Sequence, residues 1–282
     1  MMQVDAAGNV VSEYRDPMAH HDQHHLDNGE ILYTTLEALT PEQAATIPGG
    51  IPDSEAPDGK AYADCIKHVS STVSLLWSWR AIEHLDPQPF PLYPHYAREN
   101  WPLINSVFSL KDGNILASLR SVSAVIITER RTGKVTWHLD DSVLAQQHCA
   151  SELPNGNILI FDNGTFRKGE SATYSRIIEV SRASRCVVWQ YRDPHPMTFF
   201  TPFMGGAQRL GNGNTLITEA AFGRVFEDTR EGSLCWEWVN EEFADYEGLG
   251  AEEIEGLFDY PANALFRAYK YTPEEIPWLA EK

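Results

Sequence analysis

The chain has 282 residues, 43% of them hydrophobic, so it can bury a sizeable core without disulfides or a structural metal. Its 40 acidic and 22 basic side chains give a formal net charge of −18. A field of that sign repels phosphate backbones and anionic lipid surfaces, which argues against nucleic-acid and membrane partners.

The first residues carry one half of a repeat, a turn followed by an apolar strand that ends in an aromatic residue. No first hairpin stands ahead of residue 1 in this pattern. Five copies occur along the chain: DAAGNVVSEY (5–14), SSTVSLLWSW (70–79), RRTGKVTWHL (130–139), SRASRCVVWQY (181–191) and TREGSLCWEW (229–238). The recurring tryptophans are expected to pack between neighbouring sheets: Trp77, Trp79, Trp137, Trp189, Trp236 and Trp238.

The other half of the repeat is an Asn-Gly or Asp-Gly pair between apolar residues. Its copies are LDNGEIL (26–32), LKDGNIL (110–116), LPNGNIL (153–159) and LGNGNTL (210–216). Such a pair predicts a hairpin in which both turn residues take positive φ. The two halves alternate, so each repeat holds two hairpins, or four strands, which is the content of a β-propeller blade. The sequence therefore predicts an all-β fold with five to six blades, one of them incomplete, in a single domain over 1–282.

Two segments depart from the repeat. Residues 40–60 are rich in Pro, Gly and Ala and predict a long surface loop inserted in the first blade region, which could cover one mouth of the channel. Residues 239–282 form a C-terminal closing segment. Within it, 264–271 (ALFRAYKY) looks like an extra strand, and we expect it to meet residues 1–14 and close the ring.

The repeat also predicts which side chains converge on the axis. Eight residues before each turn glycine stand His21, Asn105, His148 and Gly205, which are equivalent positions near the start of an inner strand. Seven residues after each glycine stand Leu36, Arg120, Asn163 and Ala220, on the partner strand. Two imidazoles, a guanidinium and two amides then share a small volume.

This set of side chains suits a bound oxyanion. Arg provides a planar fork of donors, Asn and neutral His add directional hydrogen bonds, and none of them is negative. A histidine in the set could also act as base or nucleophile, because its pKa lies near neutral pH. In the HHDQHH segment (20–25), His24 and His25 are candidates for a surface metal site or a charged rim. No cofactor or metal is expected, and Cys65, Cys149, Cys186 and Cys235 read as buried reduced thiols.

Four stretches together resemble the arylsulfate sulfotransferase family, whose members need no nucleotide sulfate donor. They are HHD (20–22), WPLINSVFSLKDGNILASLR (101–120), QHCASELPNGNILIFDNG (147–164) and AQRLGNGNTLITEAAFGRVFE (207–227). The resemblance runs over most of the chain. It implies a six-bladed propeller that moves a sulfuryl group from an aryl sulfate to a phenol through a sulfated histidine.

The resemblance also implies roles for individual residues. His148 matches the nucleophile, Arg120 and Asn105 match sulfate-binding residues, and His20 or His21 matches a supporting histidine. We therefore expect His148, His21 and Arg120 to be catalytic, and Asn105, His20, Asn163 and Arg209 to bind substrate. The partner is a small aromatic or anionic molecule, and the sequence does not define an oligomeric state.

Two departures from the family leave alternatives open. The family motif W-x-H-x-N-S has a histidine where this chain has Leu103, which favours a second reading, a lyase or hydrolase of an aromatic or anionic molecule, with or without a metal. A non-catalytic propeller that binds a partner is a third reading. Family members also carry another blade and an export signal before the segment that matches Met1, and are often exported. As written, without a signal peptide before residue 30, the chain is expected to be cytoplasmic.

Overall fold

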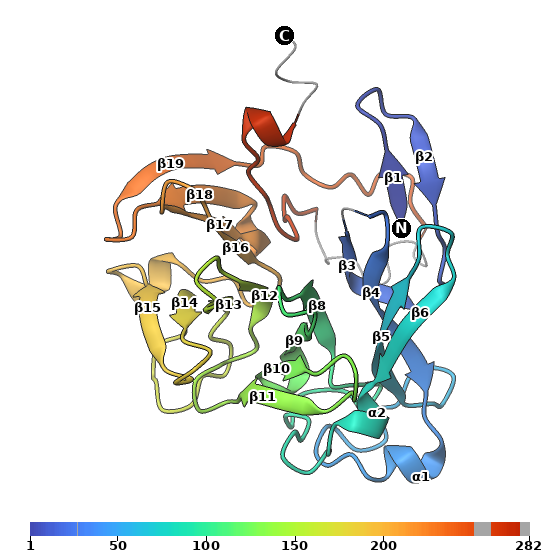
Figure 1. The fold of residues 1–282 in the computed structure, drawn as a ribbon. Coiled ribbons are helices and arrows are strands. Elements are labelled where there is room, and N and C mark those ends of the chain that lie inside the picture. Colours follow the sequence, from blue (N-terminus) through green and yellow to red (C-terminus); the bar gives the residue numbers. More distant parts are fainter. Residues whose placement is uncertain (27, 251–260, 277–282) are drawn as a thin grey trace. The chain divides into compact units, whose positions relative to one another are not determined.

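The computed structural model describes residues 1–26, 28–250 and 261–276. The chain falls into two compact units, which are described separately: unit 1 is Met1–Glu152 with the described residues from Pro273 onward, and unit 2 is Leu153–Thr272. Nearly all the regular structure in both is antiparallel β-sheet (Figure 1). This confirms the predicted all-β class. The single propeller domain and the number of blades stay predictions.

Unit 1 contains two meandering sheets in which each strand pairs with the next along the chain. The first runs β3-β4-β5-β6, with the short β7 added parallel to β5, and the second runs β8-β9-β10-β11. Their bounds are β3 Ala19–His25, β4 Ile31–Ala38, β5 Tyr62–Val69, β6 Leu75–Arg80, β7 Asn100–Trp101, β8 Ile104–Ser109, β9 Ile115–Leu119, β10 Ala124–Thr128 and β11 Val135–Leu139. The unit ends with β12, His148–Glu152, which lies beside β8.

Two smaller features complete unit 1. A hairpin of β1 (Met2–Val4) and β2 (Val10–Glu13) precedes the sheets, and its ends are tied by the Met1 amino group, 2.6 Å from the Tyr14 carbonyl. Short helices are α1 (Pro41–Ala44), α2 (Ala81–His84), the 3₁₀ turn η1 (Arg120–Val122) and η4 (Pro273–Glu275).

Unit 2 repeats the same design. Three antiparallel strands come first: β13 (Ile158–Asp162), β14 (Arg176–Val180) and β15 (Val187–Tyr191). A four-stranded antiparallel sheet follows: β16 (Gly206–Arg209), β17 (Thr215–Glu219), β18 (Arg224–Asp228) and β19 (Leu234–Val239). The unit also contains the 3₁₀ turns η2 (Pro196–Thr198) and η3 (Ala220–Phe222). The strands predicted from both halves of the repeat are therefore present.

The hairpin turns differ from the prediction in one respect. The glycines do take positive φ, at 80° for Gly113, 84° for Gly156 and 90° for Gly213, but the Asp or Asn before each of them does not. In the turn of the second sheet, Leu110 N–H donates to the Asn114 carbonyl and Gly113 N–H donates to the Leu110 carbonyl, both at 2.9 Å. This is a three-residue loop in which only the last residue is left-handed, so the expectation of two positive-φ residues was wrong.

The C-terminal segment 264–271 forms no strand, so that part of the prediction was wrong. It runs extended along unit 2: Gly205 N–H donates to the Phe266 carbonyl at 3.1 Å, and Lys270 N–H donates to the Gln208 side chain at 2.7 Å. The predicted meeting with residues 1–14 stays a prediction. Residues 251–260 and 277–282 of the predicted closing segment lie outside the described residues.

The 40–60 segment is mostly exposed and is held by contacts of its own and with the rest of unit 1. Thr40 caps α1 through a hydrogen bond from Gln43 N–H at 3.2 Å, and Ile47 is buried in the core of unit 1. Beyond it, Ile51 N–H donates to the Tyr96 carbonyl at 2.8 Å. The segment therefore packs against the loop that leads to β7.

Within each unit, tryptophans join one sheet to the outer turn of the next. In unit 1, the Trp77 and Trp79 indole N–H groups each donate at 2.9 Å to carbonyls of the turn before β11, and in unit 2 Trp189 does the same to Arg230 at 2.8 Å. Trp79 is fully buried, whereas Trp236 and Trp238 on β19 are 48% and 45% exposed. Core packing was therefore wrongly predicted for these last two.

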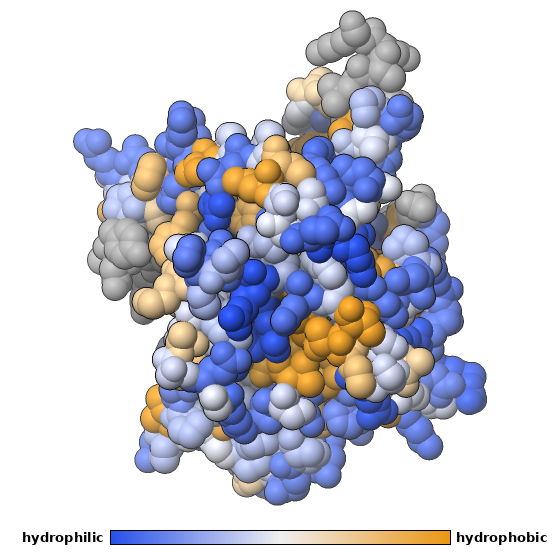
Figure 2. Space-filling model, turned by 90° about the vertical axis from the view of Figure 1, so that its left-hand side faces the viewer, coloured by the Kyte–Doolittle hydropathy of each residue, from blue (hydrophilic) through white to orange (hydrophobic). Residues whose placement is uncertain are grey.

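The face seen in Figure 2 is mainly hydrophilic and also carries patches of hydrophobic side chains.

The cysteines also divide in two. All four are free, as expected. Cys65 and Cys149 are buried, whereas Cys186 and Cys235 are exposed, so burial was wrongly predicted for these two. Burial raises the pKa of the Cys65 thiol to about 12. The two exposed cysteines lie beside or on the outer strands β15 and β19, where no further strand covers the sheet edge in the described part of unit 2.

Truncating a joining tryptophan should show how unequal these positions are. We expect Trp79→Ala to lower the free energy of unfolding by about 3–5 kcal/mol, because it leaves a large cavity and an unpaired Gly133 carbonyl. Trp236→Ala, at a half-exposed site, should cost less than about 1 kcal/mol. Urea unfolding of both variants measures this, and equal losses would contradict the packing described.

Candidate functional site

Three neighbouring strands of unit 1 carry most of the predicted site residues near their first residues. β3, β8 and β12 lie side by side, and His21, Asn105 and His148 stand at or near the start of these three strands. Arg120 follows β9 directly, at the first position of η1. Within unit 1, His21, Asn105 and His148 thus lie on the expected strands, whereas Arg120, expected on the partner strand, lies just beyond its end. That these residues form one site stays a prediction.

Irregular backbone aims these side chains. β3 has a bulge between His20 and Gln23, and β8 has one between Ile104 and Ser106. Left-handed φ values of 53° at His21, 59° at Leu103 and 48° at Cys149 occur at the same end of the three strands. Non-glycine residues adopt this region rarely, and bulges re-aim side chains where a strand begins or ends. The backbone at the starts of these strands therefore departs from regular strand pairing.

Asn105 ties β8 to the strand that carries His148. Its Nδ2 donates to the Gln147 carbonyl at 2.8 Å, and on the other side Ala150 N–H donates to Ser106 Oγ at 3.1 Å. These two bonds flank His148, which is only 3% exposed. The Asn105 Oδ1 atom is buried and has no hydrogen-bond partner, which leaves a carbonyl acceptor available at this point.

A buried carboxylate that the sequence analysis missed supports the two N-terminal histidines. Asp64 on β5 is fully buried and accepts N–H bonds from Leu103 at 2.8 Å and Ile104 at 3.0 Å. The same carboxylate lies 3.0 Å from His20 Nε2, and His20 Nδ1 lies 2.8 Å from His21 Nδ1. The signal in the sequence is a charged residue inside an otherwise buried strand, YADCIKHV (62–69).

Arg120 provides the positive charge of the site. Its N–H donates to the Leu103 carbonyl at 2.9 Å, and its guanidinium lies 5.6 Å from the centre of the Tyr96 ring. Arg120 Nε is buried and has no hydrogen-bond partner. A buried, unpaired donor of a guanidinium is costly unless a ligand occupies it, so the position favours an anion.

His21 is held in its neutral form. Its imidazole has exposed surface, but loss of solvation on its inner side, together with the adjacent His20 ring and the Arg120 guanidinium, keeps its pKa well below the usual 6.5, while Asp64 opposes this in part. The pKa of His21 in the folded protein lies below its value in the unfolded chain. The stability that the folded protein gains from neutral His21 is therefore fully present above pH 6.5. It is lost as the pH falls from 6.5 through the folded pKa.

An NMR titration of the His21 ring tests this electrostatic arrangement. We expect a midpoint below 6.5 in the wild-type protein and a higher midpoint in Arg120→Gln, because that change removes one neighbouring cation. A wild-type midpoint at or above 6.5 would contradict the described surroundings of His21.

Asn163 and Arg209, the remaining predicted residues, belong to unit 2. Asn163 Nδ2 donates to the Thr201 and Met204 carbonyls at 2.9 and 2.8 Å, so this amide orders the loop before β16. The Arg209 guanidinium lies 4.2 Å from the centre of the Trp189 ring and 3.5 Å from Glu179. Their roles in substrate binding stay predictions.

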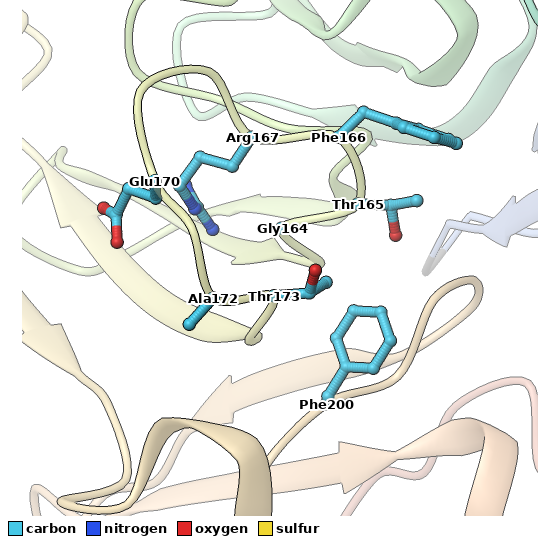
Figure 3. A pocket seen from close by; sticks show the side chains of 8 residues that line it. All are labelled: Gly164, Thr165, Phe166, Arg167, Glu170, Ala172, Thr173 and Phe200. Atoms are coloured by element: carbon cyan, nitrogen blue, oxygen red, sulfur yellow. The ribbon is translucent and has the colours of Figure 1, made fainter.

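A hollow of about 330 Å³ lies beside Asn163 in unit 2 (Figure 3). Gly164 permits a close approach there, since a Cβ on it would lie 1.8 Å from the Tyr174 carbonyl. Arg167 donates to Asp162 at 2.7 Å, and its Nε and Nη2 have no hydrogen-bond partner. Asp162 is shared between Arg167 and Arg176, at 2.7 and 2.8 Å, and Glu170 also lines the hollow.

Residues 1–26, 28–250 and 261–276 contain no group of three or more His, Cys, Asp or Glu side chains that could hold a metal ion. His24 instead lies against Phe108, with ring centres 5.4 Å apart. None of the helices in the same ranges is long and apolar enough to cross a membrane.

Comparison with known proteins gives one family match. The model of the family described as Arylsulfotransferase (ASST) matches residues 1–241. A search of curated protein sequences finds no match.

Several solved structures are similar to this chain at low identity. A protein of unknown function from Bacteroides caccae is 14% identical, with a TM-score of 0.47, and the match covers 82% of this chain and 86% of that one. A catalytically inactive virginiamycin B lyase from Staphylococcus aureus, solved with quinupristin, is 9% identical, with a TM-score of 0.47 and coverage of 85% and 62%. A protein of unknown function from Dyadobacter fermentans is 14% identical, with a TM-score of 0.45 and coverage of 77% and 63%.

Proposed function

Since this chain belongs to the arylsulfotransferase family, we propose that it transfers a sulfuryl group from an aryl sulfate to a phenolic acceptor through a histidine intermediate. The observation that carries the proposal is the buried, unpartnered Nε of Arg120, together with its closeness to the neutral His21. A trigonal sulfuryl group in transfer carries negative charge on its oxygens, and such charge is stabilised by fixed donors.

The first half-reaction forms an N–S bond. An imidazole nitrogen of His148 attacks the sulfur of the aryl sulfate, and the S–O bond to the ring breaks, with its electron pair leaving on the phenolate. Arg120 binds the sulfonate oxygens and the Asn105 side chain positions the strand that carries His148. In the second half-reaction the acceptor phenol loses its proton, its oxygen attacks the sulfur, and the N–S bond breaks to restore His148.

His21 is the group that accepts and returns the phenol proton. We assign the tautomer in which His20 Nε2–H faces Asp64 and His20 Nδ1 accepts a hydrogen bond from Nδ1–H of His21. His21 then has its lone pair on Nε2 and can act as a base. Asp64 and His20 are positioning residues in this scheme, since they act through His21.

A chromogenic assay tests the proposal. 4-Nitrophenyl sulfate is incubated with and without a phenol acceptor, and release of 4-nitrophenol should depend on the acceptor, with parallel double-reciprocal plots for the two substrates. Absence of acceptor-dependent release would overturn the sulfuryl-transfer proposal.

A second candidate function follows from Leu103. The family histidine at this position is absent, although Leu103 keeps its backbone bonds to Asp64 and Arg120. A lyase or hydrolase acting on an aromatic or anionic molecule would need fewer groups around a transferred anion. Product formation from an aryl sulfate without any acceptor, with water as the only nucleophile, would favour a hydrolase.

A further inference from the structure

The loop between α2 and β7 brings three aromatic rings to the edge of the site. The Tyr93 and His95 rings are stacked, with centres 5.9 Å apart and planes at 14°, and the His95 and Tyr96 ring centres are 4.6 Å apart. The Tyr96 ring faces the Arg120 guanidinium. His95 is exposed and the two tyrosines are half-buried, so part of each ring system is open to a ligand.

This loop is held firmly by the rest of unit 1. The Arg98 guanidinium donates to the carbonyls of Ala44 at 3.0 Å and Ile47 at 3.1 Å, in the 40–60 segment. At the end of the loop, Trp101 Nε1 donates to the Phe90 carbonyl at 2.9 Å. The rings are therefore fixed before any ligand arrives, which reduces the entropy lost on binding.

A buried glutamine links the rings to the strand of the proposed nucleophile. Gln146, 1% exposed, stands two residues before His148; its Oε1 accepts from the Tyr96 hydroxyl and its Nε2 donates to His95 Nε2, both at 2.9 Å. Because the amide donates to His95 Nε2, the proton of neutral His95 lies on Nδ1. Loss of solvation and the Arg120 charge lower the pKa of His95, which favours this neutral form.

We propose that Tyr93, His95 and Tyr96 form the binding surface for the aromatic ring of the phenolic acceptor. This inference rests on the proposed function, and it assigns the acceptor side of the same site. A flat, uncharged ring can pack against the exposed His95 and the half-buried Tyr93, while its oxygen points toward the charge of Arg120. Leu103, half-buried near Arg120, adds apolar surface where the family has a histidine.

The test measures binding of 2-naphthol by isothermal titration calorimetry, without a sulfate donor. Tyr93→Leu and, separately, His95→Ala should each weaken binding about 3–10-fold, through the loss of ring stacking. Tyr93→Phe keeps the ring and should stay within about 2-fold of wild type. Tyr62→Leu is the matched control: Tyr62 is a half-buried tyrosine of the same unit whose hydroxyl bonds to Asp58, and its replacement should leave naphthol affinity unchanged.

The outcomes separate this inference from the proposed function. Naphthol binding that depends on Tyr93 and His95 in a protein without sulfuryl transfer would support the ring surface and overturn the reaction. Sulfuryl transfer with naphthol affinity and acceptor KM unchanged in both variants would overturn the ring surface alone. No measurable naphthol binding to the wild type would also overturn it.

Discussion

Replacing His148 by alanine is expected to lower kcat for sulfuryl transfer by at least about 10³-fold, because the imidazole that forms the covalent intermediate is gone. His148 is 3% exposed at the start of β12, between two hydrogen bonds that fix the strand. The folded state should survive, since Gln147 and Ala150 supply the strand contacts through their backbone atoms. Steady-state release of 4-nitrophenol measures the effect.

His25→Ala is the matched control for this change. His25 is an exposed histidine at the other end of β3, and its loss should leave kcat within about 2-fold of wild type. Equal rates for wild type and His148→Ala would remove the histidine intermediate from the account and would favour a non-catalytic binding protein.

Replacing Arg120 by glutamine is expected to lower kcat/KM by about 10²–10³-fold. The guanidinium donors act on charge that develops on the sulfonate oxygens, and loss of one such fixed donor usually costs this much. Arg120→Lys should recover part of the loss, because it restores the charge but not the planar fork. The rate of sulfuryl transfer from the aryl sulfate should fall more than the affinity for a neutral phenol.

Arg15→Gln controls for a general change in net charge, since the Arg15 side chain is 82% exposed and pairs with the nearby Glu13. Its kcat/KM should match that of the wild type. If Arg120→Gln also matched the wild type, the sulfuryl group would not bind at this guanidinium.

Most of the strand plan could be predicted because it depends on local turn chemistry. Each glycine of the Asn-Gly and Asp-Gly pairs occupies a left-handed position, and strands follow on both sides of it. Counting from Gly113 placed Asn105 on β8, and placed Arg120 one residue beyond the end of β9. The turn class was less accessible, since the residue before glycine accepts either geometry and the bulge is decided by strand pairing.

The supporting groups could not be predicted because they depend on long-range contacts outside the repeat register. Asp64 on β5 reaches His20 on β3 and Leu103 just before β8, and only the assembled unit shows that its buried charge is paired. Tyr93 and His95 lie in a loop without a repeat signal, beside Arg120 from a different sheet. Core packing was wrongly predicted for the exposed Trp236, because the position of a tryptophan in the repeat does not tell whether a further strand covers it.

The most direct test of the histidine mechanism is the mass of the enzyme after reaction with an aryl sulfate in the absence of a phenol, with an alkaline quench. The account predicts one added SO₃ group on the peptide that contains His148, its disappearance when a phenol is supplied, and its absence in His148→Ala. Active enzyme that never carries the group, or that carries it on another residue, would contradict the account.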